Sequence, residues 1–247
     1  MADVAGQALK QASSVHLISA HPRFFLEPAI TFHGKDYIDV AGIQTGEGWT
    51  FDPYKKELRK PFSTPLAAQN AFEWPLALYQ RAPVKPVINQ EGPYGHPLES
   101  DGRAPLPPRK AGYWSFLSGA QGHTYGCFGI WNWGAPIKWF PSYDFKTALN
   151  LPSVAQMKYM AEFFGAIRWW TLEPHHELIQ NQPTEWMLKM GLAKSASGDL
   201  AVAYLPDNAE ITIEMRAFPA AMQAKWFSPT TGAYQTISGT VHPKNGS

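Results

Sequence analysis

One glutamate stands where a compact apolar segment ends in a glycine-rich turn. The segment PVINQE closes with Glu91, and the residues GPYG, which include Tyr94, follow it directly. In parallel α/β proteins the carboxyl ends of the strands line the binding crevice, so a carboxylate placed there can meet a substrate. We therefore interpret Glu91 as a candidate nucleophile and Tyr94 as a candidate substrate contact. The competing interpretation is a carboxylate that only caps a turn.

Three further predicted strand ends carry the same mixture of polar and aromatic side chains. They are His21 after the first strand, Gln44, Glu47 and Trp49 after the second, and Trp131, Asn132 and Trp133 after the fourth. Such groups suit a carbohydrate, because sugar hydroxyls need polar partners while sugar C–H faces pack on flat rings. For the tryptophans, burial in a core is the competing interpretation. His123 is also a candidate substrate contact, in competition with a structural role near a helix end.

Hydrophobic periodicity predicts the helices and strands that would hold these groups at one edge of a sheet. We expect helices over 4–12, 67–80, 113–122 and 154–167, the last capped by Ser153, and strands over 15–20, 36–44, 86–92 and 124–133. A loop is expected between the first two strands. Because strands alternate with helices, the pattern indicates parallel βαβ units with right-handed crossovers.

The texture of the sequence changes after Trp170. Short strands separated by turn residues are expected over 187–194, 200–205, 211–215, 223–227 and 233–237. Such spacing is typical of an antiparallel β domain. The sequence therefore predicts an α/β region over 1–170 and a small antiparallel β-sandwich over 171–247.

Charge and composition exclude several classes of function. The 247 residues carry 21 Lys+Arg against 20 Asp+Glu and a net charge of +1, so binding to nucleic acid or to an anionic membrane has no electrostatic support. No signal peptide and no apolar stretch of about 18 residues is present, which leaves the localisation open. The single cysteine, Cys127, cannot form an internal disulfide, and we expect it in the core.

Common cofactor and nucleophile motifs are missing from the sequence. Neither a dinucleotide-binding nor a P-loop glycine pattern occurs, and there is no G-x-S-x-G elbow. The run PHHE at 174–177 lacks the i, i+4 spacing of a zinc helix. We therefore expect no cofactor and no metal site.

Three segments together resemble the apiosidase-like glycoside hydrolases. They are KPVINQEGPYGH, YWSFLSGAQGHTYGCFGIWNWG and the final WFSPTTGAY. The resemblance covers nearly the whole chain and implies a catalytic TIM barrel of the retaining clan, followed by a small β domain that carries the name collagen-binding. That name alone gives no reason to expect collagen as a ligand. By the resemblance, Glu91 is the nucleophile after barrel strand seven, His21 and Gln44 end strands five and six, and Trp131 follows strand eight.

The resemblance also shows two departures. The acid/base carboxylate of barrel strand four would lie upstream of Asp3, and the family tends to have histidine where Glu47 stands. A complete (β/α)₈ barrel takes about 250 residues, so the region before the β tail has room for half of one. Half a barrel has two open edges. Either the N-terminal half is absent from this sequence, or a second copy closes the sheet as a homodimer.

The expected function is retaining hydrolysis of glycosidic bonds in plant or microbial polysaccharides, provided that an acid/base is supplied. Glu47 is the nearest substitute within the chain, because it follows a neighbouring strand end. A carbohydrate-binding protein without catalysis is the alternative from another class. A non-functional gene fragment is the third interpretation.

Overall fold

A computed structural model describes residues 2–22, 26–46, 51–52, 57–58, 64–95, 108–135, 144–219 and 221–237. The helices are α1 (Ala2–Ala12), α2 (Leu26–His33), α3 (Thr64–Tyr79), α4 (Pro108–Leu117), α5 (Phe145–Leu149) and α6 (Pro152–Gly165). The strands are β1 (Ala41–Gln44), β2 (Phe51–Asp52), β3 (Glu57–Leu58), β4 (Val87–Glu91), β5 (Ala120–His123), β6 (Leu172–Pro174), β7 (Gly191–Ser195), β8 (Ala201–Tyr204), β9 (Lys225–Phe227) and β10 (Tyr234–Thr236). The fold is mixed α/β, with a parallel sheet and antiparallel sheets.

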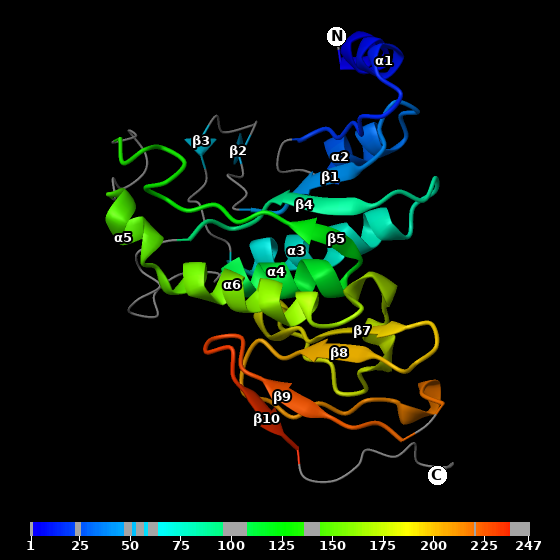
Figure 1. The fold of residues 1–247 in the computed structure, drawn as a ribbon, viewed down its shortest axis with the longest axis vertical. Helices are drawn as coiled ribbons and strands as arrows, with labels where there is room; N and C mark the ends of the chain where they lie inside the picture. The colour runs from blue at the N-terminus through cyan, green and yellow to red at the C-terminus, as the bar shows by residue number, and fades with distance from the viewer. Residues whose placement is uncertain are drawn as a thin grey trace.

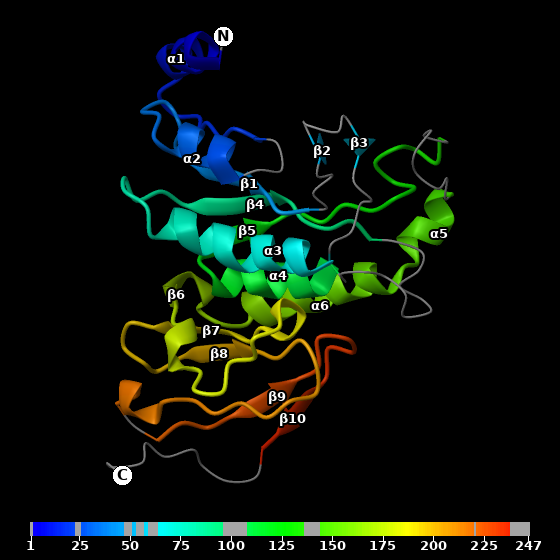
Figure 2. The ribbon, with the colours of Figure 1, turned by 180° about the vertical axis from the view of Figure 1, so that it is seen from behind.

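The parallel sheet has the strand order β1-β4-β5. A parallel bridge between Ser19 and Val40 extends it beyond β1, and a second bridge joins Gly95 to Cys127 past the carboxyl ends of the strands. Helices α3, α4 and α6 lie along one side of this sheet, and the tail strands β7–β10 lie beyond the helices (Figures 1 and 2). The helices therefore form a layer between two groups of strands.

Helix α4 is buried on two sides, because it packs against the parallel sheet on one side and against the tail strands on the other. Tyr113, Trp114 and Leu117 share one hydrophobic core with tail residues such as Val202 and Tyr204. The rings of Tyr113 and Tyr204 stack with centroids 4.6 Å apart, and Trp114 Nε1 donates a hydrogen bond to the Lys189 carbonyl at 2.8 Å. A helix that is apolar on most of its surface is stable only inside a core, so α4 requires both neighbours.

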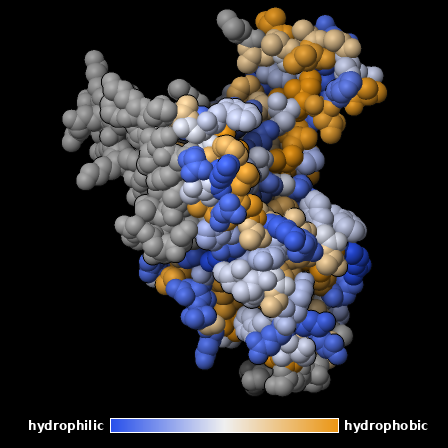
Figure 3. Space-filling view, turned by 60° about the vertical axis from the view of Figure 1, so that its left-hand side comes forward, coloured by the Kyte–Doolittle hydropathy of each residue, from blue (hydrophilic) through white to orange (hydrophobic). Residues whose placement is uncertain are grey.

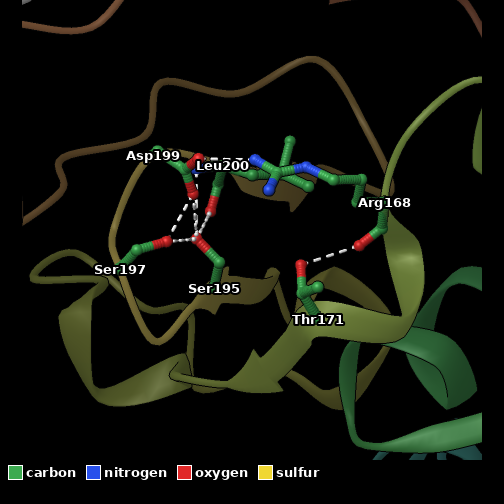
Figure 4. A network of polar contacts seen from close by, with 6 residues as sticks. All are labelled: Arg168, Thr171, Ser195, Ser197, Asp199 and Leu200. Carbon is green, nitrogen blue, oxygen red and sulfur yellow. Dashed lines mark hydrogen bonds and ion pairs between the residues drawn. The ribbon is translucent and has the colours of Figure 1, made fainter.

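The tail consists of a three-stranded antiparallel sheet, β6-β7-β8, and a two-stranded antiparallel sheet, β10-β9. A polar network ties the first of these to the end of the helical layer (Figure 4). The Arg168 guanidinium contacts the Asp199 carboxylate, which also accepts hydrogen bonds from the hydroxyls of Ser195 and Ser197. Hydrogen bonds from Ser197, Arg168 and Ser195 hold the pKa of Asp199 below its usual range.

Apolar side chains are exposed at the N-terminal end of the molecule. Hydrophobic residues gather on the surface over α1 and the segment that follows it (Figure 3). Val15 and Leu17, which are 80% and 75% exposed, precede the bridge at Ser19. Val4 and Leu9 of α1 are exposed as well. This end of the sheet thus presents an apolar edge, which water-soluble proteins normally cover.

Several predicted elements are confirmed, and others need correction. Helices α1, α3 and α6 and strand β4 lie where the sequence pattern predicts them, and Cys127 is buried. The predicted strand 15–20 is reduced to the single bridge at Ser19, because residues 14–16 form a bend in which the Ser13 hydroxyl accepts the His16 N–H. The expected loop after Pro22 contains α2, whose Ala29 packs under β1.

The fourth predicted strand is displaced toward the N-terminus. Strand β5 covers 120–123, and Trp131 and Trp133 lie in turns several residues later. Gly119, at φ +97°, ends α4 early enough for the strand to begin at Ala120. The predicted Ser153 cap is also wrong, since Leu151 is the N-cap of α6 and the Ser153 hydroxyl contacts the hydroxyl of Tyr125 instead.

Two strands predicted in the tail are placed differently. Of 211–215, the structure has a single antiparallel bridge between Ile213 and Ile179. Of 187–194, the first two residues lie in a 3₁₀ turn, Trp186–Leu188, and β7 starts at Gly191. None of the helices in the described part of the chain combines the length and the apolar composition of a membrane span.

His176 joins the helical layer to the tail and predicts a pH dependence. Its Nδ1 accepts the Leu192 N–H at 3.0 Å, its Nε2 lies 3.0 Å from the Ser118 hydroxyl, and its ring packs on Phe72. Burial lowers the pKa of His176 to about 4. Between about pH 6.5 and pH 4 this imidazole is protonated in the unfolded chain but neutral in the folded chain. The free energy of unfolding therefore falls as the pH falls through that window.

We expect His176→Phe to remove up to about 3 kcal/mol of that acid destabilisation. The measurement is urea unfolding at pH 7.5 and pH 4.5, with His16→Gln as the control at an exposed histidine. If the free energy of unfolding decreases equally between pH 7.5 and pH 4.5 in wild type and in His176→Phe, His176 is not the source of this pH dependence.

Candidate functional site

Glu91 ends β4 at a bulge that changes the direction of its side chain. Ile43 of β1 pairs with Asn89, yet the next residue, Gln44, pairs with Glu91, so Gln90 is the extra residue. Consecutive side chains of a regular strand point to opposite faces, and a bulge breaks that alternation. The structure shows the result: Gln90 Nε2 donates to the Ser19 hydroxyl at 2.8 Å, and Glu91 also reaches the segment beyond β1.

The Glu91 carboxylate meets His21 across the end of β1. His21 Nε2 lies 3.2 Å from Glu91 Oε2, and the two side chains are 47% and 26% exposed. The carboxylate is therefore held by a neighbour and still open to solvent. An imidazole at this distance can orient a carboxylate and, when protonated, pair with it.

The main chain at Glu91 is fixed from the neighbouring strand. The N–H groups of Thr45 and Gly46 both donate to the Glu91 carbonyl, at 2.9 and 2.8 Å. The Thr45 hydroxyl in turn accepts a hydrogen bond of 2.7 Å from Asn89 Nδ2, and both side chains are wholly buried. The ends of β1 and β4 are thus joined at the level of Glu91. Pre-organisation of this kind is what a reacting group needs.

His123, at the end of β5, is placed beneath this strand end. A Cβ atom added to Gly92 would lie 2.4 Å from His123 Cε1, so the imidazole occupies the space next to the residue after Glu91. Both ring nitrogens are buried. Desolvation lowers the pKa of His123 to about 4, so its ring is neutral at pH 7.

Aromatic residues line the turn that follows β5. The Tyr94 ring meets the Trp131 ring edge-on at 6.2 Å and the Phe128 ring at 5.5 Å. Main-chain hydrogen bonds from the Gly95 N–H to Gly126 and from the Phe128 N–H to Gly95 hold the two segments together. Tyr94, three residues after Glu91 in the sequence, therefore forms one aromatic cluster with Trp131.

The turn itself is fixed by a buried asparagine. Asn132 Oδ1 accepts the Gly129 N–H at 2.9 Å, and its Nδ2 donates to the Ala135 carbonyl at 2.8 Å. The next residue, Trp133, is 90% exposed and adopts φ +53°, a left-handed conformation that is rare for residues other than glycine. An exposed indole held in a sparsely populated backbone conformation is a pattern found at functional sites.

The structure thus brings together some of the predicted site residues. Glu91, His21 and Gln44 meet at the end of β1 and β4, and Tyr94 meets Trp131. Glu47 and Trp49 lie outside the described residues. Within the described part of the chain, no group of three or more His, Cys, Asp or Glu side chains could hold a metal ion.

Sequence reasoning missed Asn89 and Thr45, which fix the strand ends. The available signal was the position of Asn89 two residues after the apolar Val87, which places both on the same, buried face of a regular strand. A buried amide needs partners, so this asparagine was a candidate for a structural hydrogen-bond network.

Comparison with known protein families gives two matches. The model described as "Apiosidase-like, catalytic domain" matches residues 1–171. The model described as "Putative collagen-binding domain of a collagenase" matches residues 174–246. The chain therefore belongs to the apiosidase-like family and carries a C-terminal region that matches the second model. A search of the curated proteins finds no match.

Solved structures support a glycoside hydrolase-like fold. A glycoside hydrolase family 5 protein from Bacteroides vulgatus matches 98% of this chain with a TM-score of 0.77 at 22% identity. A second structure, named glycoside hydrolase, matches 96% of this chain with a TM-score of 0.76 at 21% identity. The alignments cover only 54% and 55% of those two proteins, so this chain spans about half of their length.

Proposed function

We propose that the chain carries the nucleophile half of a retaining glycoside hydrolase site, with Glu91 as the nucleophile. The observation that supports it most is the bulge, which gives Glu91 a solvent-accessible carboxylate beside His21 at the carboxyl edge of the parallel sheet. Membership of the apiosidase-like family supports the same reaction class. The substrate class that we propose is plant or microbial polysaccharide.

In the proposed reaction, the Glu91 carboxylate attacks the anomeric carbon and displaces the leaving oxygen, which takes a proton from a second carboxyl group. Water then hydrolyses the glycosyl-enzyme. Retaining enzymes hold the two carboxyl groups about 5 to 5.5 Å apart. Gln44 contacts the sugar in this proposal, which is supported by its pairing with Glu91 in the sheet. His21 orients the nucleophile.

We propose Glu47 as the second carboxyl group, which acts as the acid/base. It follows β1 by three residues, and β1 neighbours β4 in the sheet. If a carboxylate from another barrel strand does this work instead, the isolated chain is weakly active, because loss of a general acid typically costs about 10² to 10⁴-fold.

We expect slow hydrolysis of activated aryl glycosides, whose leaving groups need little protonation, and its loss in Glu91→Ala. The measurement is release of the aryl alcohol over hours at high protein concentration. Glu162→Gln, on the exposed face of α6, is the matched control and should retain the wild-type rate. Turnover that persists in Glu91→Ala would contradict the role of Glu91 as the nucleophile. An unchanged rate and pH profile in Glu47→Gln would show that Glu47 is not the acid/base.

A carbohydrate-binding role without turnover is the second candidate function. Trp133 favours it, because a 90% exposed indole on a turn held by Asn132 offers a flat apolar face without any need for catalysis. In the same turn, Trp131 packs edge-on against Tyr94. Sugars pack on such faces, and we take the contact to be of the same order as a pair of aromatic rings, which is worth about 0.5 to 1.5 kcal/mol beyond area burial.

We expect Trp133→Ala to weaken glycan binding about three- to tenfold, which corresponds to that contact energy. Trp170→Ala provides the control, since this indole is 62% exposed at the start of the tail, away from β4. A glycan array followed by titration of the best ligand gives the measurement. Equal losses in both variants would show that exposed indoles in general, rather than Trp133, hold the glycan.

We also propose that the parallel sheet is part of a (β/α)₈ barrel whose other strands come from additional sequence or from a second copy. The supporting facts are the apolar edge at Val15 and Leu17 and the half-length coverage of the solved structures. An isolated chain with that edge should self-associate at micromolar concentration. Size-exclusion chromatography with light scattering is the measurement.

The double variant Val15→Lys, Leu17→Lys should shift the chain toward monomer. Val84→Lys is the matched control, because Val84 is 87% exposed in the loop before β4 and its substitution should leave the association unchanged. A wild-type chain that is a stable, cooperatively folding monomer would exclude the homodimer.

A further inference from the structure

Three polar atoms are buried between the parallel sheet and α4 without a protein partner among the described residues. They are Asn89 Oδ1 and both ring nitrogens of His123. Buried polar atoms in folded proteins are almost always hydrogen-bonded, to protein or to an internal water molecule. Three of them in one place therefore call for a ligand that can hydrogen-bond.

The two residues are neighbours in the sheet. Asn89 of β4 pairs with His123 of β5 in parallel register, so their side chains stand on the same face. That face meets α4: Asn89 Nδ2 donates to the Ser115 hydroxyl at 2.9 Å, and a Cβ on Gly112 would lie 3.4 Å from His123 Cδ2. The unpaired atoms thus belong to one layer.

The hydrogen-bonding capacity of the two side chains is complementary to water. Both hydrogens of Asn89 Nδ2 are used, one for Thr45 and one for Ser115, so the amide has only an acceptor left. A neutral imidazole offers one N–H donor and one bare nitrogen acceptor. A water molecule can donate to both acceptors, or accept from the N–H while it donates to the amide oxygen.

Glycines make room for this arrangement. A side chain at Gly92 would overlap the imidazole, and one at Gly112 would crowd both Met160 and the ring. The ring therefore lies between the residue after Glu91 and the surface of α4.

We propose that a bound water molecule bridges Asn89 Oδ1 and a ring nitrogen of His123, and that this hydrated pair positions Glu91. The link to Glu91 runs from Asn89 through the Thr45 hydroxyl to the Thr45 N–H, which donates to the Glu91 carbonyl. On the other side, the imidazole supports Gly92. The positioning role rests on the proposed function of Glu91, whereas the water site does not.

A double-mutant cycle of Asn89→Leu and His123→Phe tests the water site by urea unfolding. With a bridging water, His123→Phe lowers the folding equilibrium constant about tenfold in the wild-type background and by much less when Asn89 is already Leu. Without it, His123→Phe only removes two unpaired nitrogens, which leaves the constant equal or higher in both backgrounds. Equal effects in both backgrounds would overturn the proposal.

A second measurement does not depend on the folding of Asn89→Leu. Water–protein cross-relaxation in the wild-type chain should show a long-lived water next to the His123 ring, and the signal should be lost in His123→Phe. A ring without a long-lived water neighbour would also overturn the proposal.

The positioning role has its own readout in an active preparation. His123→Phe should lower kcat about tenfold with little change in KM, and His123→Gln, which keeps a donor and an acceptor, should restore most of it. Equal kcat in wild type and His123→Phe would refute positioning while leaving the water site intact. Activity that survives Glu91→Ala would refute the proposed function and leave the unfolding cycle unaffected.

Discussion

The burial of α4 on two sides is the constraint on which the rest of the structure depends. Its aromatic face, with Tyr113 and Trp114, completes the core of the tail, while its small and polar face, with Gly112 and Ser115, lies against β4 and β5. Trp114 is fully buried and its indole N–H donates to a tail carbonyl. A shift of the helix would therefore break this hydrogen bond as well as the one between Ser115 and Asn89. The position of the sheet is therefore set by the tail as well as by its own strands.

The candidate site follows from that layer. Ser115 of α4 holds Asn89, Asn89 holds Thr45, and the main chain of Thr45 holds Glu91. The bulge then carries the carboxylate over to His21. Each step is a hydrogen bond or a register shift of the backbone. The position of Glu91 is therefore determined by buried hydrogen bonds and by strand pairing rather than by the conformation of a loop.

Part of this could be predicted from sequence, because the relevant signals are local. A short apolar run that ends in QEGPYG marks both β4 and Glu91, and the periodic helices α3 and α6 are long enough to be recognised. The sequence pattern also placed His21 and Gln44 at strand ends, and the structure brings them to Glu91. The bulge at Gln90 could not be predicted, since it depends on how β1 and β4 pair.

The remaining errors arise where tertiary packing overrides pattern. The aromatic run before Trp133 has strand-like composition, but Asn132 ties it into a turn and β5 forms earlier, after Gly119. Similarly, the apolar residues Val15 and Leu17 are typical of a buried strand, yet the bridge of this segment is at Ser19 and both side chains are exposed.

The shared core has a practical consequence for how this polypeptide can be divided. The two family models meet between residues 171 and 174, yet the packing of Tyr113 against Tyr204 crosses that boundary. A protein fragment that ends at this boundary would expose the aromatic face of α4 to water. The C-terminal segment thus shares a core with the region before it, and transferring it alone to a different protein would transfer an incomplete folding unit.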